Sequence, residues 1–158
     1  MNIDKDRLYA FIKKAGQSTY AVSGVESVAY DKNGFKELRF ADDDYSYKDT
    51  YTGFFRSRGI EIVSYKNKPV WIATYGGGML EDDVDFAIKT FSFLKKAFLA
   101  HEVGFQTFRG PHQFEEDKWK YTYKQEGTIS EFVGYEEIHF NNKLAFFHRI
   151  IGGLIKQK

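Results

Sequence analysis

The sequence has no cysteine, only two prolines and almost no excess of charge of either sign. The missing cysteines exclude disulfide bridges and thiolate metal sites. Acidic and basic residues are interleaved along the chain, and the net charge is +1. No cluster of basic residues stands out, which argues against direct nucleic-acid binding by this chain. No apolar run is long enough to cross a bilayer, and no charged leader precedes one. These absences favour a soluble, bacterial-type cytoplasmic protein with no membrane contact, and no motif calls for a cofactor.

Aromatic residues, in contrast, are plentiful. They make up 18% of the chain, with 16 phenylalanines and 11 tyrosines. Phenylalanine in such numbers indicates a core, whereas tyrosine indicates strand surfaces or a wet cavity. A length of 158 residues suits one domain with a sizeable core, so we expect residues 1–158 to form a single domain.

The most informative pattern is an internal repeat. Residues 59–71 return as residues 134–146, and the pair Gly77-Gly78 returns as Gly152-Gly153, all at an offset of 75 residues. The segment 45–48 returns at 121–124, one residue further along. Such self-similarity predicts two copies of one supersecondary unit, here approximately residues 45–80 and 121–155.

The periodicity within each copy predicts strands, and that between the copies predicts a helix. Each repeat alternates as a three-stranded antiparallel meander, with tight turns at Asn67 and Asn142 and a flexible bend at the glycine pair. A helix over 82–100, capped by Asp82, joins the repeats, and another runs from Asp4 to residue 15, ended by Gly16. Residues 28–30 and 37–40 are short strand candidates around a turn at 31–34. The predicted class is therefore α+β, with the duplicated meanders forming one curved sheet or half-barrel under both helices.

Strand alternation assigns side chains to faces of the sheet. Glu61 and Glu136 each begin a mainly apolar row, where an ionised carboxylate is costly unless it is paired or close to solvent. If each hairpin loop has an even number of residues, the next strand adds its alternate residues to the same row. In the first repeat these are Val70, Ile72 and Thr74, and in the second they are Ala145, Phe147 and Arg149. The two glutamates are either structural, paired or solvated, or they line a cavity as symmetry-related carboxylates.

Other candidate sites are weaker. Arg109, in the turn Phe108–Pro111, either presents its guanidinium to an anionic ligand or pairs with an acid. His139, His148 and Glu137 fall on the opposite face by parity, but their spacing fits no metal motif, so a polar sheet face is favoured and no metal site is predicted. No Ser-His-Asp arrangement is apparent in the sequence.

An ordered set of short motifs carries a family resemblance. The set is the following: residues 15–21, Tyr45-x-Tyr47-x-Asp49-x-Tyr51-x-Gly53, Lys68–Trp71, Phe93–Ala97, Phe108–Pro111 and Gly134–Ile138. Together these resemble a bacterial and archaeal family of domains of unknown function. The resemblance implies a domain found alone or C-terminal to XRE-type helix-turn-helix regulators, and it implies no activity and no site residues. A sensor role would follow only by analogy of architecture.

Three hypotheses follow. The first is a small-ligand-binding or sensor module, whose ligand would lie in a concavity lined by Tyr47, Tyr51, Glu61, Trp71, Arg109 and Glu136. The second is a small enzyme with Glu61 or Glu136 as general base. The third is a protein-interaction domain, for instance a homodimer through an aromatic sheet face or edge.

Overall fold

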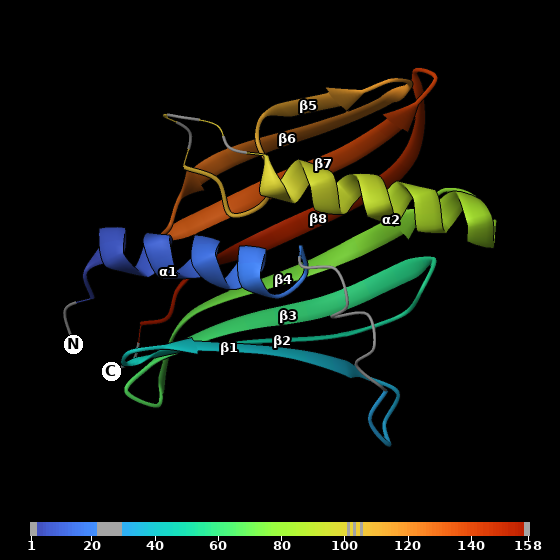
Figure 1. Cartoon of the computed structure of the whole chain (residues 1–158). Coiled ribbons are helices and arrows are strands. Elements are labelled where there is room, and N and C mark those ends of the chain that lie inside the picture. The colour runs from blue at the N-terminus through green and yellow to red at the C-terminus, as the bar shows by residue number, and fades with distance from the viewer. Residues whose placement is uncertain (1–2, 22–29, 101, 103, 105, 157–158) are drawn as a thin grey trace.

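The computed structural model describes residues 3–21, 30–100, 102, 104 and 106–156. Two helices lie on one face of a curved, eight-stranded antiparallel sheet (Figure 1), which confirms the α+β class. The elements, in chain order, are α1 (Lys5–Ser18), β1 (Lys36–Asp42), β2 (Tyr45–Thr52), β3 (Arg56–Tyr65), β4 (Lys68–Met79), α2 (Val84–Leu99), β5 (Gln113–Glu116), β6 (Trp119–Thr128), β7 (Glu131–Phe140) and β8 (Lys143–Leu154).

The strands are ordered β1-β2-β3-β4-β8-β7-β6-β5. Each half of the sheet is thus a meander of consecutive strands, and the halves meet where β4 pairs with β8. Each meander has the three predicted strands plus an edge strand, β1 or β5. The strand candidate 37–40 is confirmed within β1, which pairs with β2. Of the strand candidate 28–30, Tyr30 is not in a strand, and residues 28 and 29 lie outside the described residues.

The first helix begins as predicted and ends later. The Asp4 carboxylate accepts hydrogen bonds from the amides of Asp6 and Arg7 and so caps α1. The helix continues through Gly16, because the amide and hydroxyl of Thr19 both bond to the Ala15 carbonyl oxygen. Gly16 is therefore a residue within the helix and not its cap.

The second helix is capped one residue later than predicted. The carboxylate of Asp83, and not that of Asp82, accepts the Phe86 amide at 2.8 Å. Along the buried side of α2, Phe86 and Phe93 both stack on Trp119 of β6, with ring centroids 5.5 Å apart in each pair. This packing fixes α2 over the second half of the sheet.

The predicted hairpin turns are confirmed, but the glycine pairs are not bends. Lys66 and Asn67, like Asn141 and Asn142, have positive φ angles between 49° and 63°, as two-residue hairpin turns require. Gly77 and its neighbours lie inside β4 and pair with β3 and β8. A Cβ on Gly77 would lie 2.0 Å from the carbonyl oxygen of Phe147, so the close approach of β8 requires glycine there.

A β-bulge in each half overturns the predicted faces. Val63 pairs with Trp71 while Ser64 pairs with Pro69, so Val70 has no partner in β3. The same shift between Ile138 and His139 leaves Ala145 without a partner in β7. An extra residue reverses alternation beyond it. The residues that share a face with Glu61 or Glu136 are therefore Trp71, Ala73 and Tyr75, and Phe146, His148 and Ile150, in place of the predicted sets.

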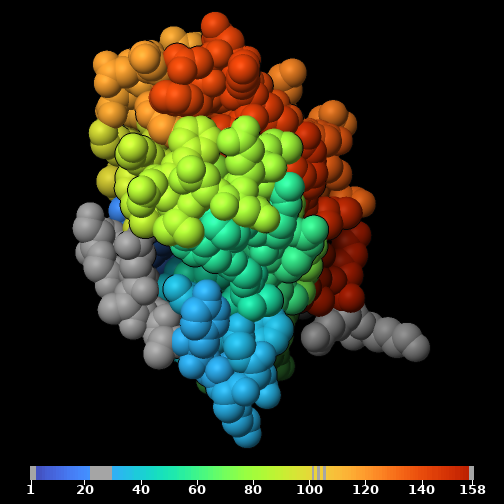
Figure 2. Space-filling view, turned by 90° about the vertical axis from the view of Figure 1, so that its right-hand side faces the viewer, coloured from blue at the N-terminus to red at the C-terminus, as the bar shows by residue number. Residues whose placement is uncertain are grey.

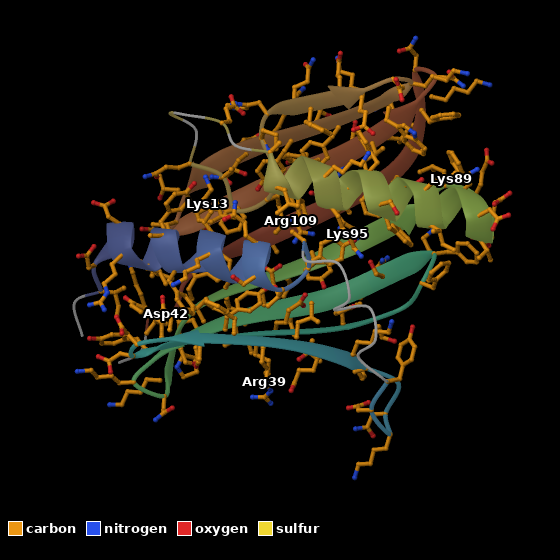
Figure 3. All side chains as sticks on the ribbon, in the orientation of Figure 1. Lys13, Arg39, Asp42, Lys89, Lys95 and Arg109 are labelled. Atoms are coloured by element: carbon orange, nitrogen blue, oxygen red, sulfur yellow. The ribbon has the colours of Figure 1, made fainter. Side chains whose placement is uncertain are left out.

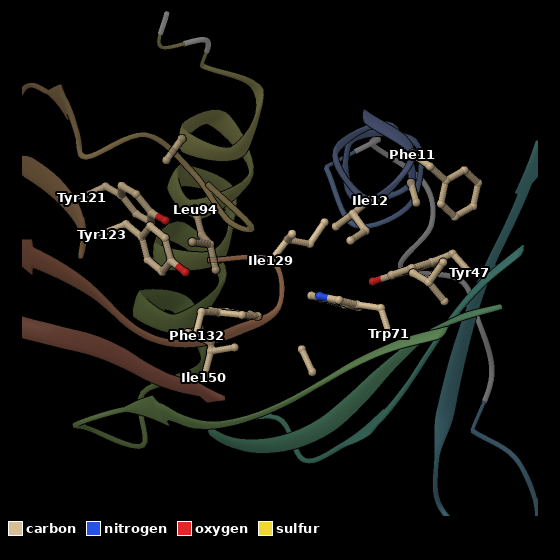
Figure 4. Close-up of a cluster of buried hydrophobic side chains, with 14 of the residues drawn as sticks. Phe11, Ile12, Tyr47, Trp71, Leu94, Tyr121, Tyr123, Ile129, Phe132 and Ile150 are labelled. Carbon is tan, nitrogen blue, oxygen red and sulfur yellow. The ribbon is translucent and has the colours of Figure 1, made fainter. Parts of the chain in front are cut away.

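The core lies between the helices and the inner face of the sheet. Figure 4 shows Trp71 among buried side chains from both helices and both halves. Its ring is fully buried and stacks on Phe132 at a centroid distance of 6.0 Å. No helix among the described residues is long and apolar enough to cross a membrane.

Candidate functional site

A cavity of about 450 Å³ opens between α1, α2 and the first half of the sheet. Its walls are largely aromatic and aliphatic, from Ile12 on α1, Phe91 and Phe98 on α2, and Phe54 after β2. Figure 2 shows α2 lying against the residues that connect β2 to β3, in agreement with the edge-to-face contact between Phe54 and Phe91. A cavity of this size suits a small organic molecule.

Ionisable side chains gather on the floor of this cavity. Figure 3 shows Arg109 between α1 and α2, with Lys13 and Lys95 nearby, and all three line the cavity. Arg109 belongs to the segment between α2 and β5, where the Thr107 hydroxyl accepts from the Arg109 amide and donates to the Gly110 carbonyl oxygen. This local turn holds the guanidinium inward, as the sequence Phe108–Pro111 suggested.

Arg109 joins the two predicted glutamates. Its Nη1 lies 3.0 Å from Glu61 Oε1, and its Nη2 lies 3.5 Å from Glu136 Oε2. The guanidinium also lies over the rings of Tyr75 and Phe98, 5.1 Å from each centroid. One buried cation therefore pairs with a carboxylate from each half of the sheet, which satisfies charges that would otherwise be costly to bury.

Four residues, which we call the polar row, lie opposite one another across four adjacent strands. They are Ser57 (β3), Gly77 (β4), His148 (β8) and Glu136 (β7). Ser57 Oγ lies 3.0 Å from His148 Nε2, and His148 Nδ1 lies 3.3 Å from Glu136 Oε2. The other oxygen of Glu136 accepts from the Tyr121 hydroxyl at 2.8 Å. The row is thus a continuous chain of polar contacts from the cavity into the interior.

A second pair of acids lies beside this row. Asp49 and Glu61 are directly opposite in the pairing of β2 with β3, and both line the cavity. The Tyr75 hydroxyl donates to Asp49 at 3.0 Å, and the nearby Tyr47 hydroxyl acts to lower the pKa of Glu61. Two neighbouring buried carboxyl groups repel each other when both are ionised, so such a pair retains a proton.

The environment separates the pKa values of the three acids. Burial, followed by the charge of Glu61, raises the pKa of Asp49 to about 8. Burial also raises the pKa of Glu61, against the opposing effect of Arg109. Burial alone would raise the pKa of Glu136 too, but Arg109, His148 and Tyr121 outweigh it and hold that pKa below its usual value. Glu136 is therefore the ionised partner of Arg109 near neutral pH.

The imidazole of His148 is neutral near neutral pH. Burial lowers its pKa, and the nearby cations Arg109 and Arg58 act in the same direction, although Glu136 opposes them. A neutral imidazole has one donor and one acceptor nitrogen. His148 can therefore accept a proton on one ring nitrogen.

The structure brings most of the predicted residues together. Tyr47, Tyr51, Glu61 and Arg109 line the cavity. Glu136 is fully buried and reaches the site through Arg109 and His148. Trp71 is outside the cavity lining and lies in the core, and its Nε1 has no hydrogen-bond partner among the described residues.

Sequence reasoning missed four residues of the site. Asp49 alternates with Tyr47 and Tyr51 along β2, so strand parity alone would have found it. His148 was assigned to the opposite face, because the bulge that reverses β8 leaves no mark in the sequence. Ser57 and Tyr75 gain their roles only from the register of β3 and β4.

Metal ligation finds no support in the geometry of the described residues. Within the described ranges, no group of three or more His, Asp or Glu side chains is arranged to hold a metal ion. His139 and Glu137 lie on the outer face, away from His148, as the bulge requires.

Comparison with known proteins identifies the family. The model of the family described as Domain of unknown function (DUF5680) matches residues 49–155, and the chain belongs to this family. The matched range begins at Asp49 and includes every residue of the polar row. No curated protein and no solved structure matches the chain.

Proposed function

We propose that this protein is a small-molecule-binding domain whose ligand lies in the cavity between the two helices and β1–β4. The observation that carries the proposal is the cavity itself, which combines aromatic walls with a floor of buried ionisable groups. Walls that are mostly apolar, with a few convergent polar groups, are the usual composition of a ligand site.

The charges of the floor define the kind of ligand. Arg109 already contacts Glu61 and Glu136, so its positive charge is balanced within the protein. Asp49 and Glu61 offer carboxyl oxygens directly to the cavity. A ligand with N–H or O–H donors on a flat apolar body complements these two carboxyl groups, whereas an anionic head group placed beside them would be repelled by Glu61. Lys13 and Lys95 also line the cavity, but they belong to α1 and α2 and not to the sheet.

A sensor role is a finer form of the same proposal. Family membership is compatible with it, and it would agree with the regulator fusions that the sequence resemblance implies. We also infer that the two halves of the sheet arose by duplication. Support comes from the shared order of four strands and from the bulges at equivalent positions, Val70 and Ala145.

Thermal-shift measurements with three related indoles test the proposal. Tryptamine, indole-3-acetamide and indole-3-acetate share one bicyclic body and differ in head group. We expect the amine and the amide to raise the melting temperature and the carboxylate to have no effect. At 100 times its Kd a ligand adds about 2.7 kcal/mol, which corresponds to about 5–10 °C for a chain of this size.

The variant Gly16→Leu provides the test that the cavity is the site. Gly16 lines the cavity, and among the described residues outside its own turn of helix no heavy atom lies within 4 Å of an added Cβ, so a leucine there adds its side chain to the cavity wall. We expect Gly16→Leu to abolish the shifts. Ala10→Leu is the matched control, because Ala10 is exposed on α1 outside this cavity. Shifts that survive Gly16→Leu, or the absence of any shift together with a side-chain-filled cavity in a crystal structure, would overturn the proposal.

A further inference from the structure

The polar row contains the contacts of a nucleophilic triad. A hydroxyl, an imidazole and a carboxylate follow one another at 3.0 Å (Ser57 Oγ to His148 Nε2) and 3.3 Å (His148 Nδ1 to Glu136 Oε2). These are the distances expected of a serine nucleophile, its base and the group that orients the base in a protein without substrate. We propose that Ser57 is a catalytic nucleophile for acyl transfer, with His148 as general base and Glu136 as its positioning residue.

The proposed role requires the His148 tautomer that carries its proton on Nδ1. His148 Nδ1 lies 3.2 Å from Arg109 Nη2 and 3.3 Å from Glu136 Oε2. Because a guanidinium only donates, the contact with Arg109 belongs to the other tautomer, in which Nε2 donates to Ser57. Glu136 Oε2 is buried without a hydrogen-bond partner among the described residues, which is costly. A shift of the proton to Nδ1 gives that oxygen a donor and leaves Nε2 free to accept the Ser57 hydroxyl.

The register of the sheet places Ser57 and His148 close enough to form a hydrogen bond across β4. Ser57 and His148 are on strands that flank β4, and the residue between them is Gly77. Because glycine has no side chain, nothing separates the hydroxyl from the imidazole across the width of β4. Ser57 and His148 both line the cavity, while Glu136 is fully buried behind them. The two reacting groups thus face the space where a substrate would bind, and the orienting group is shielded from water.

The reaction that fits is transfer of a small acyl group from a neutral ester. Ser57 Oγ bonds to the acyl carbon as its proton passes to His148 Nε2, and the ester C–O bond breaks as that proton passes to the leaving alkoxide. Water then attacks the acyl-serine, gives a proton to His148 and releases the carboxylic acid, and His148 returns the proton to Ser57. The proposal uses the same cavity as the binding function, but its readout is a covalent bond and does not depend on a reversible ligand.

Covalent labelling of the full chain tests the proposal. A fluorophosphonate probe reacts with activated serines, and p-nitrophenyl acetate reports acyl transfer. We expect one adduct by intact mass, mapped to Ser57 by peptide analysis. Ser57→Ala should lose the adduct and the esterase activity, and Ser64→Ala, on the same strand but outside the cavity, should keep both. His148→Gln should slow labelling at least about 100-fold, the lower range for loss of a general base.

A variant of Glu136 tests its role in positioning His148. Glu136→Gln should slow labelling in protein that is folded by circular dichroism, since the tautomer of His148 is no longer fixed. The proposal is overturned if folded wild-type protein forms no adduct at Ser57, or if His148→Gln labels as fast as wild type. Labelling of Ser57 without any indole shift would contradict the binding proposal alone, and an indole shift without labelling would contradict this one.

Discussion

At the scale of single residues, Arg109 balances the charge of the buried site. Removing one partner of a buried ion pair leaves an uncompensated charge, which destabilises proteins by about 3–5 kcal/mol. Arg109 contacts two carboxylates, and its side chain is only 10% exposed. Its loss would leave the buried, ionised Glu136 without a cationic partner.

We therefore predict that Arg109→Met lowers the free energy of unfolding by about 3–5 kcal/mol, measured by urea denaturation. Arg109→Lys should recover only part of this loss, because one ammonium cannot bridge Glu61 and Glu136 in the way that a forked guanidinium does. The control is Arg149→Met, which breaks a more exposed pair with Glu137 and should cost about 1 kcal/mol or less. Equal effects of the two methionine variants would contradict this account of the site.

The raised pKa of Asp49 predicts a dependence of stability on pH. The folded protein keeps the Asp49 proton up to about pH 8, whereas the unfolded chain loses it near its ordinary value of 3.8. Unfolding therefore releases a proton between these values, and the stability from Asp49 falls as pH rises across the window. The slope is at most about 1.4 kcal/mol per pH unit.

Asp49→Asn removes the titrating carboxyl group, so the stability of the variant should decrease less with rising pH than that of the wild type. We expect its melting temperature, relative to wild type, to rise from pH 6.5 to pH 8.5. The titration of His148, whose pKa shift has the opposite sign, occurs in both proteins and therefore largely cancels from this difference. A constant difference between the two proteins across these pH values would show that Asp49 does not retain its proton.

At the scale of elements, the bulges decide which side chains reach the site. Period-two alternation correctly placed Glu61 and Glu136 inward on β3 and β7, because no irregularity precedes them in those strands. It failed for β4 and β8, where the extra residues Val70 and Ala145 reverse the alternation. A bulge depends on how two strands meet and not on the composition of either one, so His148 could not be placed from the sequence.

The glycines of β4 offer a prediction at the same scale. Gly77 has a φ of 152°, and an added Cβ would lie 2.0 Å from a backbone oxygen of β8. We predict that Gly77→Ala destabilises the protein by at least about 1–3 kcal/mol, the cost of a strained backbone. Gly16→Ala, in the open space of α1, should instead stabilise it by about 0.5–1 kcal/mol. Urea midpoints measure both changes, and a neutral Gly77→Ala would show that β4 and β8 can move apart.

At the scale of the whole molecule, the sheet is continuous only through the pairing of β4 with β8. These strands each have two neighbours, whereas β1 and β5 are edges. We predict that hydrogen exchange is slowest in β4 and β8 and at least about 10-fold faster in β1 and β5, since edge strands open locally at lower free energy. If β4 exchanged as fast as β1, the two halves would separate before the edges fray.

Much of the architecture was predictable, and the assembly of the site was not. The α+β class, the approximate positions of the helices and the turns at Asn67 and Asn142 follow from local patterns, which depend on near neighbours. The meeting of Arg109 with Glu61 and Glu136 depends on where the segment after α2 crosses the sheet. Only tertiary structure fixes such a crossing, so sequence reasoning proposed the three residues separately and did not predict their contact.

The shared guanidinium also limits how the sequence of this protein can change over generations. One arginine pairs with a glutamate from each half. Replacing either glutamate by an uncharged residue therefore changes the charge balance between Arg109 and the remaining glutamate. The two halves of the sheet are therefore not free to change independently at these positions, although they lie far apart along the chain. A lineage that lost one glutamate would select for changes at the other glutamate or at Arg109, so substitutions at these three positions should be epistatic.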